Sequence, residues 1–131
     1  MSDSIQVFVY GSLMRGLKYS RLMHDATFQG MASTEEPYAL YDLGPYPAAS
    51  PGGDCPLHGE LYEIDVTTLA RLDQLEGHPE LYRRSVRSLS DGSSAWLYEI
   101  VLNTETQQQL TRAPQVAGGD WRGWLALRGS T

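Results

Sequence analysis

The residue whose position most suggests chemistry is Glu76, at the end of a helix predicted over Thr67–Glu76. At about 100° per residue, Glu76 falls between Leu69 and Leu72, on the stripe that should face the core. Burial disfavours an ionised carboxylate, and the negative end of the helix dipole acts in the same direction. Both effects raise the pKa toward the range that a general base needs near neutral pH. The alternative is that the last turn frays and leaves Glu76 in water.

A second candidate is the segment Tyr10-Gly11-Ser12-Leu13, which follows a half-buried strand predicted over Ile5–Tyr10. Glycine permits a positive φ and lets another group approach the backbone closely. A strand that ends in a tight turn presents successive N–H groups, which can hold an anion or a polarised carbonyl. The alternative is an ordinary turn, because Gly and Ser often mark turns.

Three residues near Glu76 in the sequence could share its surroundings. Tyr82 follows a Gly-His-Pro turn and could return its hydroxyl to the carboxyl, although a core or strand tyrosine is the simpler interpretation. His78 suits acid–base work, but it stands in an expected exposed turn without an orienting partner, so a structural role is preferred. Asp73 lies at the edge of the apolar stripe and is expected to be solvated.

The composition of the 131 residues narrows the classes of function. The formal net charge of −6 at pH 7 argues against a nucleic-acid partner. The one cysteine, Cys55, has no activating neighbour and no histidines at ligand spacing, so neither a disulfide nor a zinc site is expected. No apolar run approaches about 18 residues, and the N-terminus lacks a signal-peptide pattern. A cytoplasmic protein without a membrane partner is expected.

The remaining patterns predict more strands than helices. Alternation or extended character marks 5–10, 25–43 with a break at 35–37, 58–64, 82–89 and 95–102, and a short helix could cover 18–24. In 58–64, Glu60 shares one side of the strand with Tyr62 and Ile64. The strands mostly follow one another, which predicts an α+β fold: a compact, mixed, barrel-like sheet with a few flanking helices, formed by one domain over 1–131.

The sequence also gives expectations for residues 42–56 and for the C-terminal part from residue 103 onward. Residues 42–56 contain four prolines and three glycines, so they are predicted to lack regular structure. Tyr46-Pro47-Ala48 could form a pocket wall or belong to a lid, or the segment could be a surface crossover. The polar tail 103–117 gives no firm prediction. Trp121 and Trp124 are expected to dock on the body, although an exposed pair could bind a protein partner.

Taken together, the motifs resemble the γ-glutamyl cyclotransferase family, in its AIG2-like and γ-glutamylamine cyclotransferase branch. The resemblance covers roughly residues 5 to 102, and Gly119-Asp120-Trp121 is similar to the end of small bacterial relatives. Its motifs are Val7–Leu13, then Gly59-Glu60-Leu61-Tyr62, then Leu72–Pro79 with Tyr82-Arg83-Arg84.

The resemblance implies an enzyme that converts a γ-glutamyl amide or amine to 5-oxoproline and releases an amine or amino acid, without metal or cofactor. It implies a cleft in which Glu76 is the general acid/base, while Tyr10, Gly11, Ser12, Leu13 and Tyr82 bind or orient the substrate. Leu13 stands where the glutathione-related branch has asparagine, which favours the γ-glutamylamine-like branch. The alternative is a non-catalytic module that binds a small molecule in the same cleft. The leaving group and the oligomeric state stay open.

Overall fold

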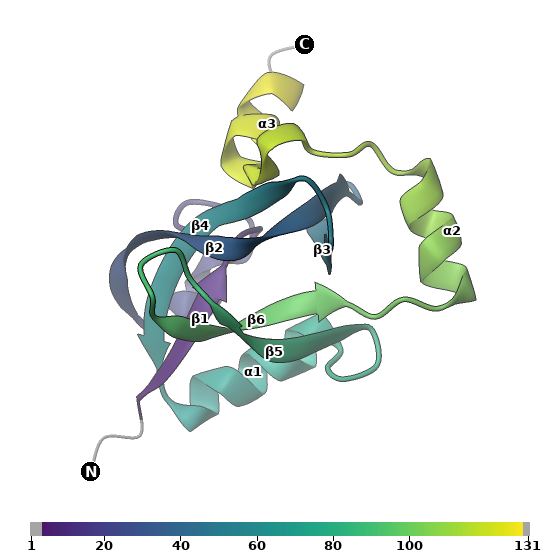
Figure 1. Cartoon of the computed structure of the whole chain (residues 1–131). Helices are drawn as coiled ribbons and strands as arrows, with labels where there is room; N and C mark the ends of the chain where they lie inside the picture. Colours follow the sequence, from purple (N-terminus) through teal and green to yellow (C-terminus); the bar gives the residue numbers. More distant parts are fainter. Residues whose placement is uncertain (1–3, 130–131) are drawn as a thin grey trace.

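Six strands form one sheet in the order β3-β2-β4-β1-β6-β5 in the computed structural model, which describes residues 4–129. The strands curl into a half-barrel (Figure 1), and only β1 and β6 among the neighbours run parallel. Their bounds are β1 Ile5–Val9, β2 Thr27–Asp42, β3 Pro47–Pro51, β4 Cys55–Ile64, β5 Tyr82–Ser88 and β6 Ser94–Ile100.

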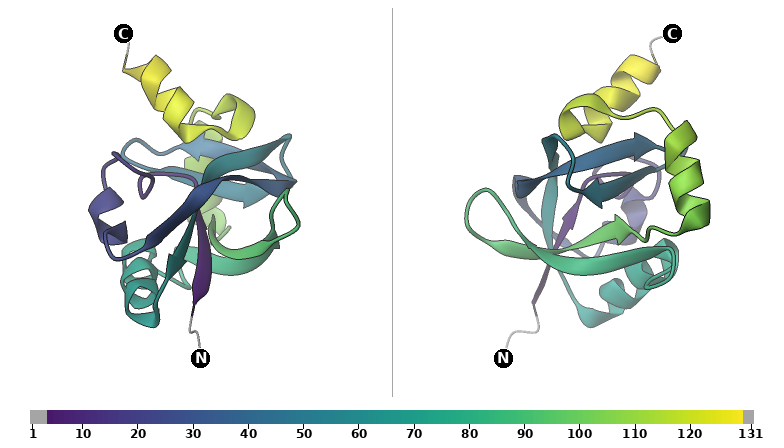
Figure 2. Two further views of the ribbon diagram at one scale, coloured as in Figure 1. Left: turned by 90° about the vertical axis from the view of Figure 1, so that its left-hand side faces the viewer. Right: turned by 45° about the vertical axis from the view of Figure 1, so that its right-hand side comes forward.

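Three α-helices surround this sheet: α1 (Val66–Glu76), α2 (Thr104–Arg112) and α3 (Trp121–Arg128). Figure 2 shows α3 and α1 at opposite ends of the half-barrel, with α2 along its flank. Short 3-10 turns cover Ser20–Met23, within the predicted helix over 18–24, and Ala117–Gly119. The predicted α+β class with a barrel-like sheet is confirmed. None of the helices in the described residues is long and apolar enough to cross a membrane.

The central strand β1 is more deeply buried than its sequence predicts. Val7, Phe8 and Val9 are all buried, so both faces of the strand are covered rather than one. As a central strand of a curled sheet, β1 leaves neither face of Val7–Val9 open to solvent. Tyr10 therefore leaves the strand already inside the protein.

Residues 42–56 are not the irregular loop that the prolines and glycines predict. Pro47–Pro51 forms β3, which pairs with β2 so that Leu40 lies opposite Ala49. Because β3 is an edge strand, its outer side needs no ladder partners, and proline is tolerated at its two ends. The turn before it closes through a hydrogen bond from Leu43 N–H to Tyr46 O (3.1 Å).

Helix α1 follows the predicted pattern closely. The Asp65 side chain accepts the Thr68 N–H (2.8 Å) at its start, and Gly77 ends it in the left-handed conformation (φ 64°). Leu72 is fully buried, whereas Leu75 is exposed. Glu76 is half-buried, so the last turn does not leave it in open water.

The C-terminal part packs against β2. Helix α2, which the polar tail did not predict, begins with a capping box between Asn103 and Thr106. The Trp121 side chain is only 1% exposed, and the Trp124 Nε1–H donates to Asp42 Oδ2 (2.8 Å). The predicted docking of both tryptophans is confirmed, and they form no exposed aromatic patch for a partner.

Candidate active site

A cavity of about 160 Å³ lies where the end of β1, the end of α1 and the starts of β3 and β5 meet. A space of this size can hold a benzene-sized molecule, so a small organic ligand fits it. It is lined by Phe8, Val9, Tyr10, Gly11, Ser12, Leu13, Tyr19, Tyr46, Pro47, Leu75, Glu76, Leu81, Tyr82 and Tyr98. The cavity therefore brings together all six residues that were selected as site candidates from the sequence. Tyr46 and Pro47 form part of its wall, which was one of the two interpretations of residues 42–56.

Glu76 is the one charged residue among those that line the cavity. Within residues 4–129, no hydrogen bond or ion pair reaches its carboxyl group. Burial alone raises the pKa of Glu76 to about 7. Near neutral pH the carboxyl group can therefore both accept and donate a proton, as an acid–base catalyst must.

The segment after β1 lines the same cavity and carries backbone donors. Its turn is fixed by hydrogen bonds from Met14 N–H to Gly11 O (3.1 Å) and from Tyr19 N–H to Ser12 O (2.8 Å). The described residues offer no acceptor to the N–H groups of Gly11, Ser12 and Leu13. Donors in such a row can bind a carboxylate or a developing oxyanion.

Gly11 is needed for close packing rather than for a positive φ. Its φ lies outside the left-handed region. A Cβ at this position would stand 2.8 Å from the Cγ and Cδ atoms of Pro47, which is too close for van der Waals contact. The glycine therefore allows the start of β3 to pack against the segment that carries the free N–H groups.

Two tyrosines flank Glu76, but neither donates a hydrogen bond to it. The Tyr10 hydroxyl donates to Tyr98 O (2.5 Å), and the Tyr82 hydroxyl donates to Pro47 O (2.9 Å). Burial, with the nearby Glu76 charge as a further cause, raises the pKa of both phenols, so both stay neutral. Tyr82 thus joins β5 to β3 at the cavity wall, and its hydroxyl does not orient the Glu76 carboxyl directly.

Asp73 is not solvated as expected. Its carboxylate accepts a bidentate pair from Arg84 (2.8 and 3.1 Å) and the Tyr98 hydroxyl (2.6 Å). Burial pushes its pKa upward, but the donors outweigh burial and hold the pKa below its usual value. The edge of the α1 stripe faces β5 and β6, where these donors lie.

His78 is half-buried rather than exposed, and its Nδ1 accepts the Arg84 N–H (3.3 Å), in keeping with a structural role.

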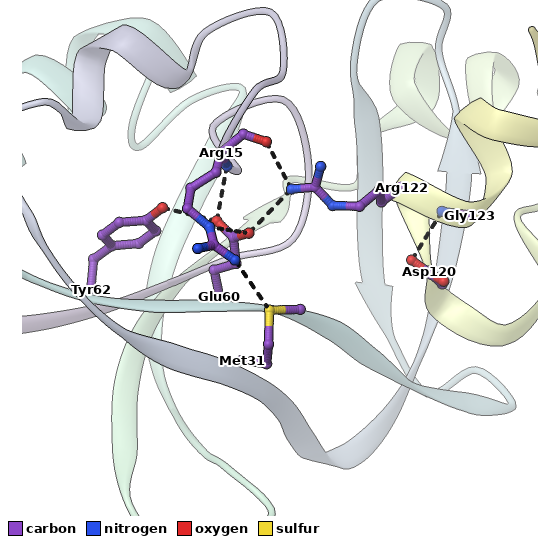
Figure 3. A network of polar contacts seen from close by, with 7 residues as sticks. All are labelled: Arg15, Met31, Glu60, Tyr62, Asp120, Arg122 and Gly123. Atoms are coloured by element: carbon purple, nitrogen blue, oxygen red, sulfur yellow. Dashed lines mark hydrogen bonds and ion pairs between the residues drawn. The ribbon is translucent and has the colours of Figure 1, made fainter.

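The sequence-based selection missed the buried carboxylate of Glu60, which is fully enclosed. It accepts hydrogen bonds from Arg15, Tyr62 and Arg122 (Figure 3). Burial raises its pKa, but these donors outweigh burial and keep the pKa below its ordinary value. The sequence signal that could have found Glu60 was its place on the same side of the strand as Tyr62 and Ile64.

Across residues 4–129, no group of three or more His, Cys, Asp or Glu gathers as a metal site would require.

A family model and curated relatives match most of this chain. Residues 7–123 match the family model described as "Gamma-glutamyl cyclotransferase, AIG2-like". The gamma-glutamylcyclotransferase family protein YtfP of Escherichia coli K12 is 38% identical over 117 residues, which cover 89% of this chain and 96% of that protein.

Solved structures share the fold. An AIG2-like protein from mouse superposes with a TM-score of 0.78 at 26% identity, covering 91% of this chain and 90% of its own. The solution structure of ytfP from Escherichia coli gives a TM-score of 0.65 at 37% identity, covering 89% of this chain and 96% of its own. A match over most of the length, in sequence and in fold, shows that the chain belongs to the AIG2-like gamma-glutamyl cyclotransferase family.

Proposed function

We propose that this protein cyclises a γ-glutamyl amide or amine to 5-oxoproline and releases the amine or amino acid, with Glu76 as the general acid/base. The observation that carries the proposal is a carboxyl group with a pKa raised to about 7 that shares one cavity with three backbone N–H groups. Neither the carboxyl group nor these N–H groups have a hydrogen-bond partner within residues 4–129. Membership of the family supports the same reaction class.

The first step needs a base. The α-amino group of the substrate is mostly protonated at neutral pH, and only the free amine can attack the γ-carbonyl carbon. Glu76 in its carboxylate form accepts the proton. The new N–C bond closes the five-membered ring and places negative charge on the former carbonyl oxygen. The N–H groups of Gly11, Ser12 and Leu13 stabilise this charge or hold the neighbouring α-carboxylate, and one oxyanion donor is worth about 3 kcal/mol.

The second step needs an acid. Glu76 gives its proton to the leaving nitrogen, the tetrahedral intermediate collapses and the bond from the γ-carbon to that nitrogen breaks. The regenerated Glu76 carboxylate then accepts the second proton from the ring nitrogen, and the released amine takes up that proton and leaves as an ammonium ion. The atoms balance without water or a cofactor. A pKa near 7 suits both halves of this cycle, because neither protonation state is strongly disfavoured.

The cavity walls favour the curled conformation that cyclisation requires. Phe8, Tyr10 and Tyr98 are buried aromatic walls, and a confined γ-glutamyl chain loses less entropy in the reaction itself. Tyr46, Leu75 and Leu81 are partly exposed at the same cavity, so they are where the leaving group would emerge. A small-molecule substrate thus fits the site, and a cytoplasmic location stays a prediction.

The test is 5-oxoproline formation from a panel of γ-glutamyl amino acids and γ-glutamyl amines. Glu76→Gln keeps the shape of the side chain but cannot take up a proton, so product should be lost. Glu80→Gln is the matched control, because Glu80 is exposed in the turn after α1 and does not line the cavity. Ligand binding without any product from the intact protein would instead support the binding-module alternative.

A further inference from the structure

Glu60 is a buried acid that the proposed reaction does not use. Its Oε1 accepts the Arg15 N–H (2.9 Å) and the Tyr62 hydroxyl (2.9 Å). Its Oε2 accepts Arg15 Nε–H (3.3 Å) and Arg122 Nη2–H (3.1 Å). The carboxylate is therefore bonded at both oxygens, as Figure 3 shows, and it is 0% exposed. A buried charge with this many donors holds its partners in one arrangement.

The partners of Glu60 lie at the end of the segment that lines the cavity. Arg15 directly follows Met14, whose N–H closes the turn on Gly11 O. Arg122 also donates to Arg15 O (2.8 Å), so both the N–H and the carbonyl of Arg15 are held. The segment thus begins at β1 and ends at a backbone clamp made by Glu60 and Arg122.

Strand pairing places this clamp close to the end of β1. Glu60 lies opposite Val9 in the β1–β4 register. The neighbouring Gly59 brings the two strands together, because a Cβ there would stand 2.2 Å from Val9 O. The acid is therefore anchored to the same rigid strands from which the Gly11–Leu13 segment leaves.

We propose that Glu60 is a positioning residue, which fixes the free N–H groups of Gly11, Ser12 and Leu13 toward the cavity. Donors that stay fixed before the ligand arrives need no reorganisation when negative charge develops. The role in substrate handling rests on the proposed function. The ordering of the segment by Glu60 does not.

The first experiment compares Glu60→Gln with Glu99→Gln. Glu99 is also buried and bonded by Arg87 and Tyr38, but within residues 4–129 it has no hydrogen bond or ion pair with Gly11–Arg15. In Glu60→Gln, kcat/KM and the affinity for 5-oxoproline, measured by calorimetry, should both fall about tenfold. The pH midpoint of kcat should stay unchanged, because Glu76 is untouched. Glu99→Gln should keep both kinetic and binding constants even where its loss of stability is similar.

A second pair of variants covers the case in which Glu60→Gln does not fold. Arg122→Met removes the guanidinium group that bonds Glu60 and the Arg15 carbonyl, and the Arg122 side chain is 44% exposed. Arg128→Met is the control, because Arg128 lies on the same helix, is similarly exposed (43%) and pairs with Asp42 instead. Arg122→Met should weaken 5-oxoproline binding about threefold, since partly exposed ion pairs contribute less than buried ones. Arg128→Met should not weaken it.

Amide hydrogen exchange separates this proposal from the proposed function. Exchange at Met14 and Tyr19, whose N–H groups close the segment, should become faster in Glu60→Gln and Arg122→Met but not in their controls. If the intact protein forms no 5-oxoproline, the proposed function fails, whereas this exchange pattern still supports the ordering role. Equal exchange in each variant and its control would overturn it.

Discussion

Glu60 and Glu76 are two carboxylic acids held away from bulk water by opposite means. Glu60 is fully enclosed and bonded by two arginines, a tyrosine and a backbone N–H, and its pKa lies below the ordinary value. Glu76 is half-buried and finds no such donor among residues 4–129, and burial raises its pKa to about 7. The comparison teaches that burial alone does not decide ionisation. The supply of donors separates an acid that holds structure from one that can move a proton.

The largest effect should come from removing the acid without donors. Glu76→Gln should lower kcat for 5-oxoproline formation by about 10²–10⁴-fold, the usual contribution of a general acid–base group. The same change should not lower stability at pH 8, because it removes a carboxylate that is ionised without a partner. Steady-state kinetics and thermal unfolding measure the two effects. Near-full activity would exclude Glu76 as the base.

Removing the acid with donors should damage stability instead. Glu60→Ala leaves a void and deprives the Arg15 N–H and the Tyr62 hydroxyl of their acceptor, which should cost about 3 kcal/mol of unfolding free energy. Urea denaturation measures this value. Glu63→Ala, on the opposite side of the same strand, is the control and should cost less than about 1 kcal/mol. Equal losses of unfolding free energy in Glu60→Ala and Glu63→Ala would contradict the structural role of Glu60.

A change in the packing of the Gly11–Leu13 segment should have a smaller effect on stability. Gly11→Ala adds a Cβ 2.8 Å from the Pro47 ring, so stability should fall by about 1–3 kcal/mol. The double variant Gly11→Ala with Pro47→Ala removes the ring and should recover part of that loss. A double-mutant cycle from urea denaturation measures the coupling, and strictly additive losses would argue against this contact.

The pH dependence of stability should show opposite signs for the two acids. Because the Glu76 pKa is raised, its favourable contribution is present at low pH and is lost as pH rises from its ordinary 4.5 to about 7. Glu76→Gln should therefore gain stability relative to the parent protein across that interval, on the order of 1 kcal/mol.

For Glu60 the pKa is lowered, so its contribution is present above the unfolded-state pKa and is lost as pH falls through the lower folded-state pKa. The deficit of Glu60→Gln should accordingly be full at neutral pH and shrink in acid. Denaturation curves at several pH values measure both trends. The same slope in both variants would contradict the comparison.

Local patterns in the sequence were sufficient for the features that one element contains. The spacing of Leu69, Leu72 and Glu76 on one helix predicted an acid on the apolar stripe, and the predicted helix over Thr67–Glu76 agrees with α1 to within one residue. The segment Tyr10–Leu13 was predicted from a strand pattern followed by Gly-Ser. These predictions succeed because the periodicity of a helix or strand fixes which neighbours share a face.

The tertiary structure alone decided which groups meet across elements. Pro47–Pro51 became a strand because the sheet order left it at an edge, where proline does no harm. Asp73 found its partners on β5 and β6, and Glu60 found Arg15 and Arg122 at 45 and 62 residues' separation. No periodicity reports contacts at such distances, because strand register and the curl of the sheet set them. The sequence by itself therefore determined that Glu76 would stand on the apolar stripe of a helix, and the fold determined that Glu60 rather than Glu76 received hydrogen-bond donors.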